Sequence, residues 1–165
     1  MEMQELEDRV GVMLTHLFVD YKIVNVMKGM SVQFIIEDFG TIVSCVNRLD
    51  YKQVQDKLTT DYNGWRVVYI STQDDLDEAR YEVLWALMRS GYMRWLRMAY
   101  PRQMKNVLMG IDNLGARIIK ERLRLWADKP RNSFWINENE YVLANGILQE
   151  YSRDPGFFDY MPEIL

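Results

Sequence analysis

The chain of 165 residues contains a single histidine, His16, and a single cysteine, Cys45. A zinc site built from Cys and His side chains needs several such ligands, so these two residues argue against one. A Ser-His-Asp triad could use only His16, which lies beside the apolar stripe of an expected helix. A structural role is favoured there over that of a general base. We therefore predict no catalytic residue, no bound metal and no cofactor.

A cluster of carboxylates surrounds the segment Thr72 to Asp75, which matches the Ser/Thr-x-x-acid pattern of a helix start. The cluster falls in the first turn of the expected helix, where the helix dipole favours negative charge. Its members are Asp74, Asp75, Asp77 and Glu78. Helix capping is therefore favoured over metal binding as the role of this cluster.

Positive charge is concentrated in the middle of the chain. Residues 1–88 carry 8 basic and 15 acidic side chains, residues 89–131 carry 11 and 3, and residues 132–165 carry 1 and 6. Arginine pairs with phosphate and aromatic rings stack on bases, so a basic band interleaved with Tyr and Trp suits nucleic acid. The side chains predicted to contact nucleic acid or another polyanion are Arg94, Arg97, Arg102, Lys105, Arg117, Lys120 and Arg124.

The acidic flanks favour another role for the same band, which is pairing with acidic groups of this chain or of a protein partner. The interleaved aromatic residues recur at helical spacing, and rings at that spacing are more often core residues than platforms for bases. These rings are Tyr92, Trp95, Tyr100 and Trp126. Internal or protein-facing pairing is the favoured interpretation, and contact with nucleic acid is the alternative.

Apolar periodicity predicts the elements of the first half of the chain. Leu6, Val10, Met13 and Leu17 repeat at steps of four, three and four, which predicts a helix over about residues 4–18. Between residues 21 and 49, β-branched and aromatic side chains dominate without a helical period, which predicts three strands in an antiparallel meander. A helix from Asp50 to about Asn63 then leads to a strand over residues 65–70, which we expect to be parallel to its neighbour.

The rest of the chain is predicted to be helical. The helix whose start is predicted at Thr72 buries Leu76, Ala79, Val83 and Leu87. After Gly91 we expect a short helix before Pro101, then helices over about residues 103–127 and 138–151. The expected fold class is α+β, with an α/β core in residues 1–90. A helical extension in residues 91–165 is expected to pack on that core as one structural unit.

Composition and targeting signals favour a protein of the cytoplasm, in a bacterium or in an infected host cell. Hydrophobic residues make up 48% of the chain, as in a globular domain. The acidic N-terminus does not resemble a signal peptide, and no apolar run approaches the ~18 residues of a membrane-spanning helix. One cysteine suits a reducing compartment. We expect no contact with a membrane.

Three segments repeat the order and spacing of a known family. They are Val32-Gln33-Phe34-Ile35-Ile36, Val43-Ser44-Cys45-Val46-Asn47, and the Gly-Trp-x-V-x-x-I segment from Gly64 to Ile70. With their helices they resemble the PD-(D/E)xK nuclease fold, above all the very-short-patch-repair endonucleases and their competence-protein and homing-endonuclease relatives. The resemblance covers about half of the chain, residues 4–90, and implies a nuclease-like core there.

The sequence departs from this family at the positions that do its chemistry. Gln33 stands where the family has its strand Asp, Cys45 where it has its second carboxylate, and Asn47 at the next polar position. A catalytic Mg²⁺ needs carboxylate oxygens, which these three side chains do not supply. Only Glu5 or Glu7 on the first helix keeps the family's character. The resemblance therefore implies a pseudo-nuclease.

Three hypotheses of function follow. The first is a non-catalytic binding protein that engages nucleic acid, a nucleoprotein complex or a protein partner; by analogy it could be a phage-type accessory factor or an inhibitor of host-defence nucleases. The second is an active metal-dependent nuclease with a relocated site built from Glu5, Glu7, Glu37 and Asp38. The third is an acidic dimeric chaperone of the type III secretion kind, which the basic helical half does not fit.

Overall fold

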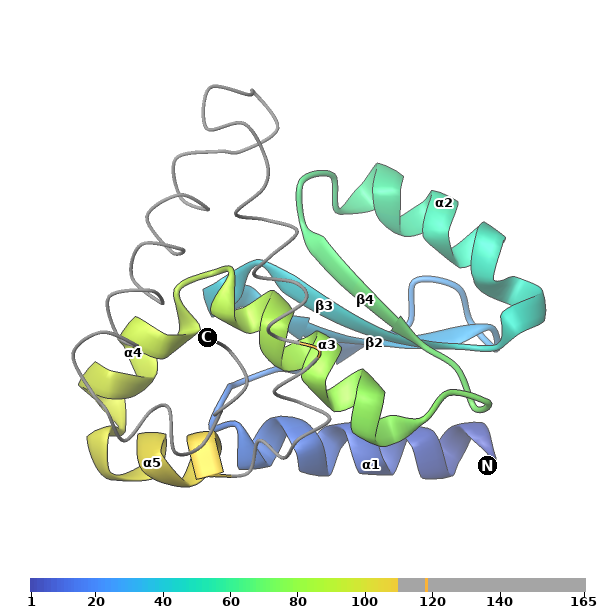
Figure 1. Ribbon diagram of the computed structural model, residues 1–165. Helices are drawn as coiled ribbons and strands as arrows, with labels where there is room; N and C mark the ends of the chain where they lie inside the picture. The colour runs from blue at the N-terminus through green and yellow to red at the C-terminus, as the bar shows by residue number, and fades with distance from the viewer. Residues whose placement is uncertain (110–117, 119–165) are drawn as a thin grey trace. The chain divides into compact units, whose positions relative to one another are not determined.

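The computed structural model describes residues 1–109 and residue 118 (Figure 1). Two 3-10 helices, η1 (Glu37–Phe39) and η2 (Arg48–Asp50), join longer elements. In chain order those elements are α1 (Met3–His16), β1 (Lys22–Val24), β2 (Ser31–Ile36), β3 (Thr41–Val46), α2 (Tyr51–Asp61), β4 (Arg66–Ile70), α3 (Leu76–Met88), α4 (Tyr92–Ala99) and α5 (Pro101–Met109).

The four strands form one mixed sheet in the order β1-β2-β3-β4. The first three strands pair antiparallel as a meander, and β4 pairs parallel to β3 after the chain crosses over through α2. Gly40 makes the tight connection before β3 with a φ of 54°, a conformation that glycine adopts at little cost. The predicted α+β class, with its meander and crossover strand, is confirmed.

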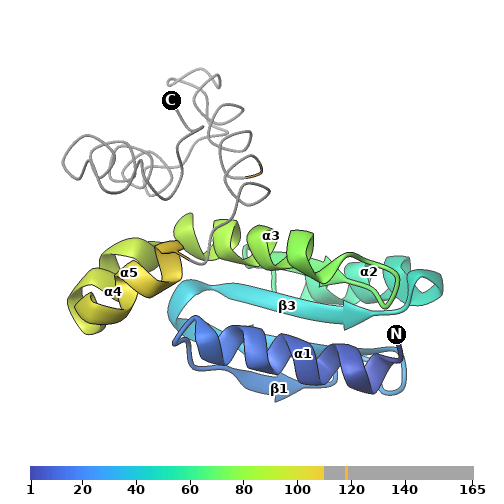
Figure 2. The ribbon, with the colours of Figure 1, turned by 60° about the horizontal axis from the view of Figure 1, so that its bottom comes forward.

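Helices cover both faces of this sheet. Figure 2 looks onto the face that α1 and α3 cover, and α2 lies behind it. Successive side chains of a strand point to opposite faces, so the two layers are built from alternate residues. On the α2 side, Ile35, Ile42 and Val46 of the sheet pack against Val54 and Leu58 of the helix.

The apolar face of α1 differs in one position from the face predicted. Leu6, Val10 and Leu14 are fully buried, whereas Met13 is only half-buried. Residues three and four apart both lie near one helical stripe, and the position of the sheet selects Leu14. The helix also ends at His16, two residues early, because Phe18 takes a φ of 62° that no helical residue can adopt.

The carboxylates before α3 act as caps, but not in the pattern predicted. The capping residue is Asp75, whose Oδ1 accepts a hydrogen bond from the Asp77 amide at 2.9 Å. The Asp74 carboxylate accepts one from the Ser71 amide at 2.7 Å. Thr72 therefore lies in the loop before α3, and the expected start at Thr72 is wrong by three residues.

By its contacts the chain divides into two compact units, Met1–Ala86 and Leu87–Leu165, with the boundary inside α3. In the second unit α5 begins at Pro101 and not at the predicted residue 103, because proline suits the first position of a helix. The remainder of the helix predicted to reach residue 127, and the helix predicted over 138–151, lie outside the described residues apart from position 118. The packing of residues 91–165 on the core stays a prediction.

A search of residues 1–109 and 118 finds no helix with the length and apolar character needed to cross a membrane.

The packing of α2 predicts the effect of truncating its buried leucine. Leu58 is fully buried in the cluster that joins α2 to the sheet. We expect Leu58→Ala to lower the free energy of unfolding by about 2–5 kcal/mol, since it removes buried methyl groups and leaves a cavity. Lys52→Ala, on the exposed side of the same helix, should change it by less than about 0.5 kcal/mol. Urea unfolding followed by circular dichroism measures both; equal effects would show that α2 does not pack as described.

Candidate functional site beside α1

The sheet register separates the strand positions at which the nuclease family has carboxylates. Gln33 pairs with Ser44 across β2 and β3, and Cys45 pairs with Val32. Residues paired across strands share a face and neighbours in sequence do not, so Gln33 and Cys45 point to opposite sides of the sheet. The structure therefore does not bring these two positions together into one site.

Gln33 is fully buried and its amide is fully engaged. Its Nε2 donates to the hydroxyls of Ser31 at 2.6 Å and Ser44 at 3.1 Å. Its Oε1 accepts a hydrogen bond from the Val26 amide at 3.0 Å. Buried polar groups need such partners, and this network leaves the Gln33 side chain with a structural role.

Cys45 is also fully buried, on the face covered by α1. Burial, together with a smaller contribution from the negative charge of Glu7 on α1, raises the pKa of its thiol to about 12. Glu7 thus lies close enough to the family's second carboxylate position to act on it electrostatically. Asn47 is exposed, one residue beyond the end of β3.

Glu7 is the first-helix carboxylate that remains over the sheet. Its pKa is raised, first by burial and then by the negative charge of Asp8. Glu5, the other candidate, is exposed and pairs with Arg9 at 2.8 Å on the outer side of the helix. A carboxylate with a raised pKa beside a like charge would be stabilised by a cation.

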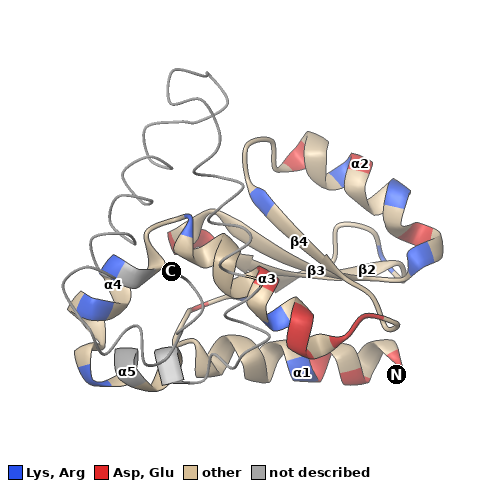
Figure 3. Ribbon diagram, in the orientation of Figure 1, with Lys and Arg blue, Asp and Glu red and all other residues tan. Residues whose placement is uncertain are grey.

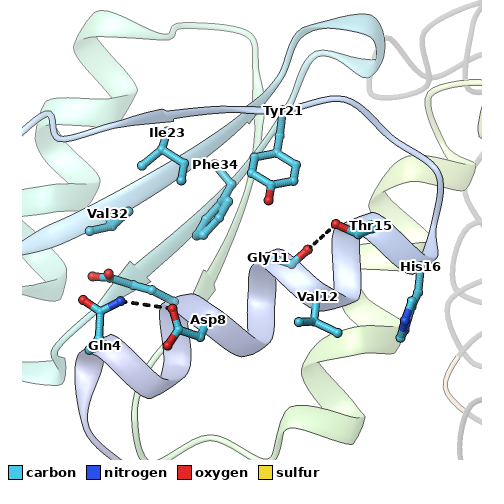
Figure 4. Close-up of a pocket in the computed structure, with 11 residues that line it drawn as sticks. Gln4, Asp8, Gly11, Val12, Thr15, His16, Tyr21, Ile23, Val32 and Phe34 are labelled. Carbon is cyan, nitrogen blue, oxygen red and sulfur yellow. Dashed lines mark hydrogen bonds between the residues drawn. The ribbon is translucent and has the colours of Figure 1, made fainter.

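A groove of about 550 Å³ lies between α1 and the edge of the sheet (Figure 4). Its upper wall comes from β1, β2 and the residue before β1, and its floor is one face of α1. Two apolar lining residues are well exposed, Ile23 by 61% and Val12 by 55%. The full lining is Gln4, Glu7, Asp8, Gly11, Val12, Thr15, His16, Tyr21, Ile23, Val32 and Phe34.

The polar groups of the groove gather on the α1 side. The Gln4 amide donates to the Asp8 carboxylate at 3.0 Å, and the Thr15 hydroxyl donates to the Gly11 carbonyl at 2.9 Å. A Cβ at Gly11 would lie 3.3 Å from the Tyr21 hydroxyl, so the glycine allows Tyr21 to approach the helix closely. The lining holds two carboxylates and no Lys or Arg.

The carboxylates proposed for a relocated metal site are not gathered. Glu37 pairs with Lys22 at 2.8 Å, next to Asp38 in η1, while Glu5 pairs with Arg9 on α1. Within residues 1–109 and 118, no group of three His, Cys, Asp or Glu side chains could hold a metal ion.

The predicted basic residues lie in the second unit, so far as the structure describes them. Arg94 and Arg97 are exposed on α4, and Arg102 is exposed in the first turn of α5. Figure 3 shows basic positions on α4 and α5 in blue. Lys105 belongs to α5, and the structure describes its backbone but not its side chain. Three further predicted contacts lie outside the described residues: Arg117, Lys120 and Arg124.

The aromatic residues of this basic segment pack on one another. The Trp95 ring lies 5.8 Å from the Tyr92 ring and 5.5 Å from the Tyr100 ring, measured between centroids. Tyr92 is fully buried and Trp95 is half-buried. A packing role therefore accounts for Tyr92 and Trp95, while Tyr100 remains partly exposed; Trp126 lies outside the described residues.

A second hollow, of about 280 Å³, lies at the carboxyl ends of β3 and β4. The chain leaves these parallel strands toward opposite faces of the sheet, a place where ligands commonly bind. Here Arg48 Nη2 faces Asp74 Oδ1 at 3.8 Å, so one positive and one negative lining group balance each other. The groove beside α1 lacks such a balance, which makes it the stronger candidate.

Sequence reasoning did not find this groove. Part of the signal was available, since Gln4, Asp8, Gly11 and Thr15 recur at helical spacing on one side of α1. The opposing wall could not be predicted, because it depends on which face of the sheet carries Ile23 and on where α1 crosses it.

Comparison of the chain with protein-family models, with curated proteins and with solved structures finds no match. The nuclease resemblance stays a proposal that rests on the order of the elements and on the residues at the strand positions.

The environment of Cys45 predicts a thiol that does not react in the native protein. A pKa raised from 9.0 to about 12 leaves about a thousandfold less thiolate at pH 8, and burial blocks access. We expect DTNB at pH 8 to react at least about 100-fold more slowly with the native chain than with the chain unfolded in guanidinium. The chain has one cysteine, so all released chromophore reports Cys45. Prompt labelling of the native protein would contradict its burial beneath α1.

Proposed function

We propose that this protein is a non-catalytic binding protein whose core has the layout of a PD-(D/E)xK nuclease. The observation that supports the proposal is where the side chains lie at the two strand positions, Gln33 and Cys45, at which the family has carboxylates. Each is fully buried, and they face opposite sides of the sheet. Metal-dependent hydrolysis of the kind that this nuclease family performs would need carboxylates that converge on one metal ion.

The residues at those positions support a role in stability. The Gln33 amide binds three neighbours and keeps the α2 side of the sheet in one register. The Cys45 thiol is closed in beneath α1 and stays protonated at neutral pH. In this proposal Glu7 is the carboxylate that keeps the family's acidic character over the sheet, and it lines the floor of the groove.

The groove supports binding of a protein partner. It combines exposed aliphatic side chains with carboxylates that no lining Lys or Arg offsets. Exposed apolar groups rimmed by charge are typical of surfaces that associate with proteins. An inhibitory partnership with a host-defence nuclease is one form that such binding would take, and it stays a prediction.

A second candidate function, contact with nucleic acid, is favoured by the second unit. Residues 87–109 contain five basic side chains and no acidic one. Arg94, Arg97 and Arg102 of this segment are exposed. Clustered arginines attract the phosphate backbone irrespective of base sequence.

The first prediction of this proposal is an absence of turnover. We expect no hydrolysis of single- or double-stranded DNA or RNA with Mg²⁺ or Mn²⁺, because Gln33, Cys45 and Asn47 offer no charged oxygen. A nicking assay across a metal titration measures this. Cleavage that a chelator abolishes, and that a Glu37→Gln/Asp38→Asn variant lacks, would show that the protein is an enzyme with a relocated site.

Fluorescence anisotropy with labelled oligonucleotides tests the second candidate function. If α4 contacts phosphates, Arg94→Glu/Arg97→Glu should weaken binding equally for all base sequences and reduce the salt slope by about 2. Lys28→Glu/Lys52→Glu makes the same charge change on exposed residues of the first unit and should weaken binding less. Affinities for non-specific sites are on the order of tens of micromolar. If the unaltered protein does not bind the oligonucleotides at that concentration, the nucleic-acid function is wrong and binding of a protein partner is the one candidate left.

A further inference from the structure

We propose that the groove beside α1 binds an extended segment of a partner protein in which a Lys or Arg is followed, two residues later, by an aliphatic residue. The inference names the partner's chemistry, and it rests on the proposed function of a non-catalytic binding protein. Four properties of the groove support it: its length, the charge of its floor, the spacing of its lining groups and the outer edge of β1, with which no strand of the described residues pairs.

The groove is long. Its α1 lining runs from Gln4 to His16 along one side of the helix. Twelve residues of helix rise by about 18 Å. An extended chain covers that distance in about five residues. The groove, of about 550 Å³, therefore has the length to hold an extended segment of about five residues.

The floor of the groove carries two adjacent carboxylates, which a bound cation would stabilise. Glu7 and Asp8 lie next to each other, and their mutual repulsion contributes to the raised pKa of Glu7. Their whole unit, residues 1–86, carries 8 basic and 15 acidic side chains, so the wider field has the same sign. A partner's ammonium or guanidinium group would remove this repulsion on binding and would be drawn to the site from a distance.

The spacing of charge and apolar surface matches an extended chain. Asp8 and Val12 are one helical turn apart, about 6 Å along the axis of α1. Side chains two residues apart in a strand point the same way and lie about 6.6 Å apart. A cation over Asp8, on the part of the helix that lies below Ile23 and Phe34 in Figure 4, therefore places the next side chain of that row beside Val12.

The edge of the sheet supplies backbone groups for such a segment. β1 is the outermost strand beside β2 and is only three residues long. Its far side pairs with no other strand of the described chain. Edge strands offer unpaired N–H and C=O groups, and an added strand gains affinity from them while alternate side chains give specificity.

The proposal is tested with three labelled heptapeptides, blocked at both ends and built on threonine. The first is Thr-Thr-Lys-Thr-Val-Thr-Thr; the second has Glu in place of Lys; the third has Lys and Val separated by two residues. We expect the first to bind at least about tenfold more tightly than either of the others, as measured by anisotropy. Equal binding of all three, or no binding of the first at millimolar protein, would overturn the proposal.

Charge reversal supplies the matched control. Glu7→Lys/Asp8→Lys should lose the first peptide and gain the second, because the sign of the floor is inverted. Glu2→Lys/Glu5→Lys makes the same change of net charge at exposed positions outside the groove and should keep the preference for the first peptide. A loss of the preference in both variants would show that the attraction is only long-range and that the groove is not the site.

Two other outcomes separate this inference from the proposed function. If the chain is a dimer in sedimentation and Ile23→Glu makes it a monomer, a second copy covers the groove and the peptide proposal is wrong. If metal-dependent cleavage is found, the proposed function fails irrespective of peptide binding. Absence of both cleavage and peptide preference overturns the groove inference alone.

Discussion

The pairing register of β2 with β3 is the constraint on which the rest of the first unit depends. It runs from Ser31 opposite Val46 to Ile36 opposite Thr41, and both strands are buried on both faces. A slip by one residue would move every side chain to the opposite face. The Gln33 amide, bound to the hydroxyls of Ser31 and Ser44, stabilises this register from within.

Both the core and the site follow from that register. It places Ile35, Ile42 and Val46 against α2, and it places Val32, Phe34 and Cys45 against α1. The positions that bear carboxylates in the nuclease family are thereby split between two faces or closed inside the protein. In residues 1–109 and 118, no strand pairs with the outer side of β1, and the groove forms between this edge of the sheet and α1.

The two compact units differ in the sign of their charge. The first carries an excess of acidic side chains, while the described part of the second, residues 87–109, has basic side chains and no acidic ones (Figure 3). The proposals above accordingly give each surface a partner of opposite charge: a cationic segment for the groove and a polyanion or acidic protein for α4 and α5. Long-range attraction of this kind affects association rates more than the fold itself.

The sequence by itself determined the elements of residues 3–88 and their order, because apolar periods of 3.6 and 2 and the turn residues are local signals. It also showed that Gln33, Cys45 and Asn47 supply no carboxylate, since that depends on residue type alone. Only the tertiary structure decided that Leu14 and not Met13 is buried, that Gln33 and Cys45 face apart, and that α1 and β1 enclose a groove. Those outcomes depend on strand register and on where a helix crosses a sheet, and such contacts join residues too far apart in sequence for any local pattern to record them.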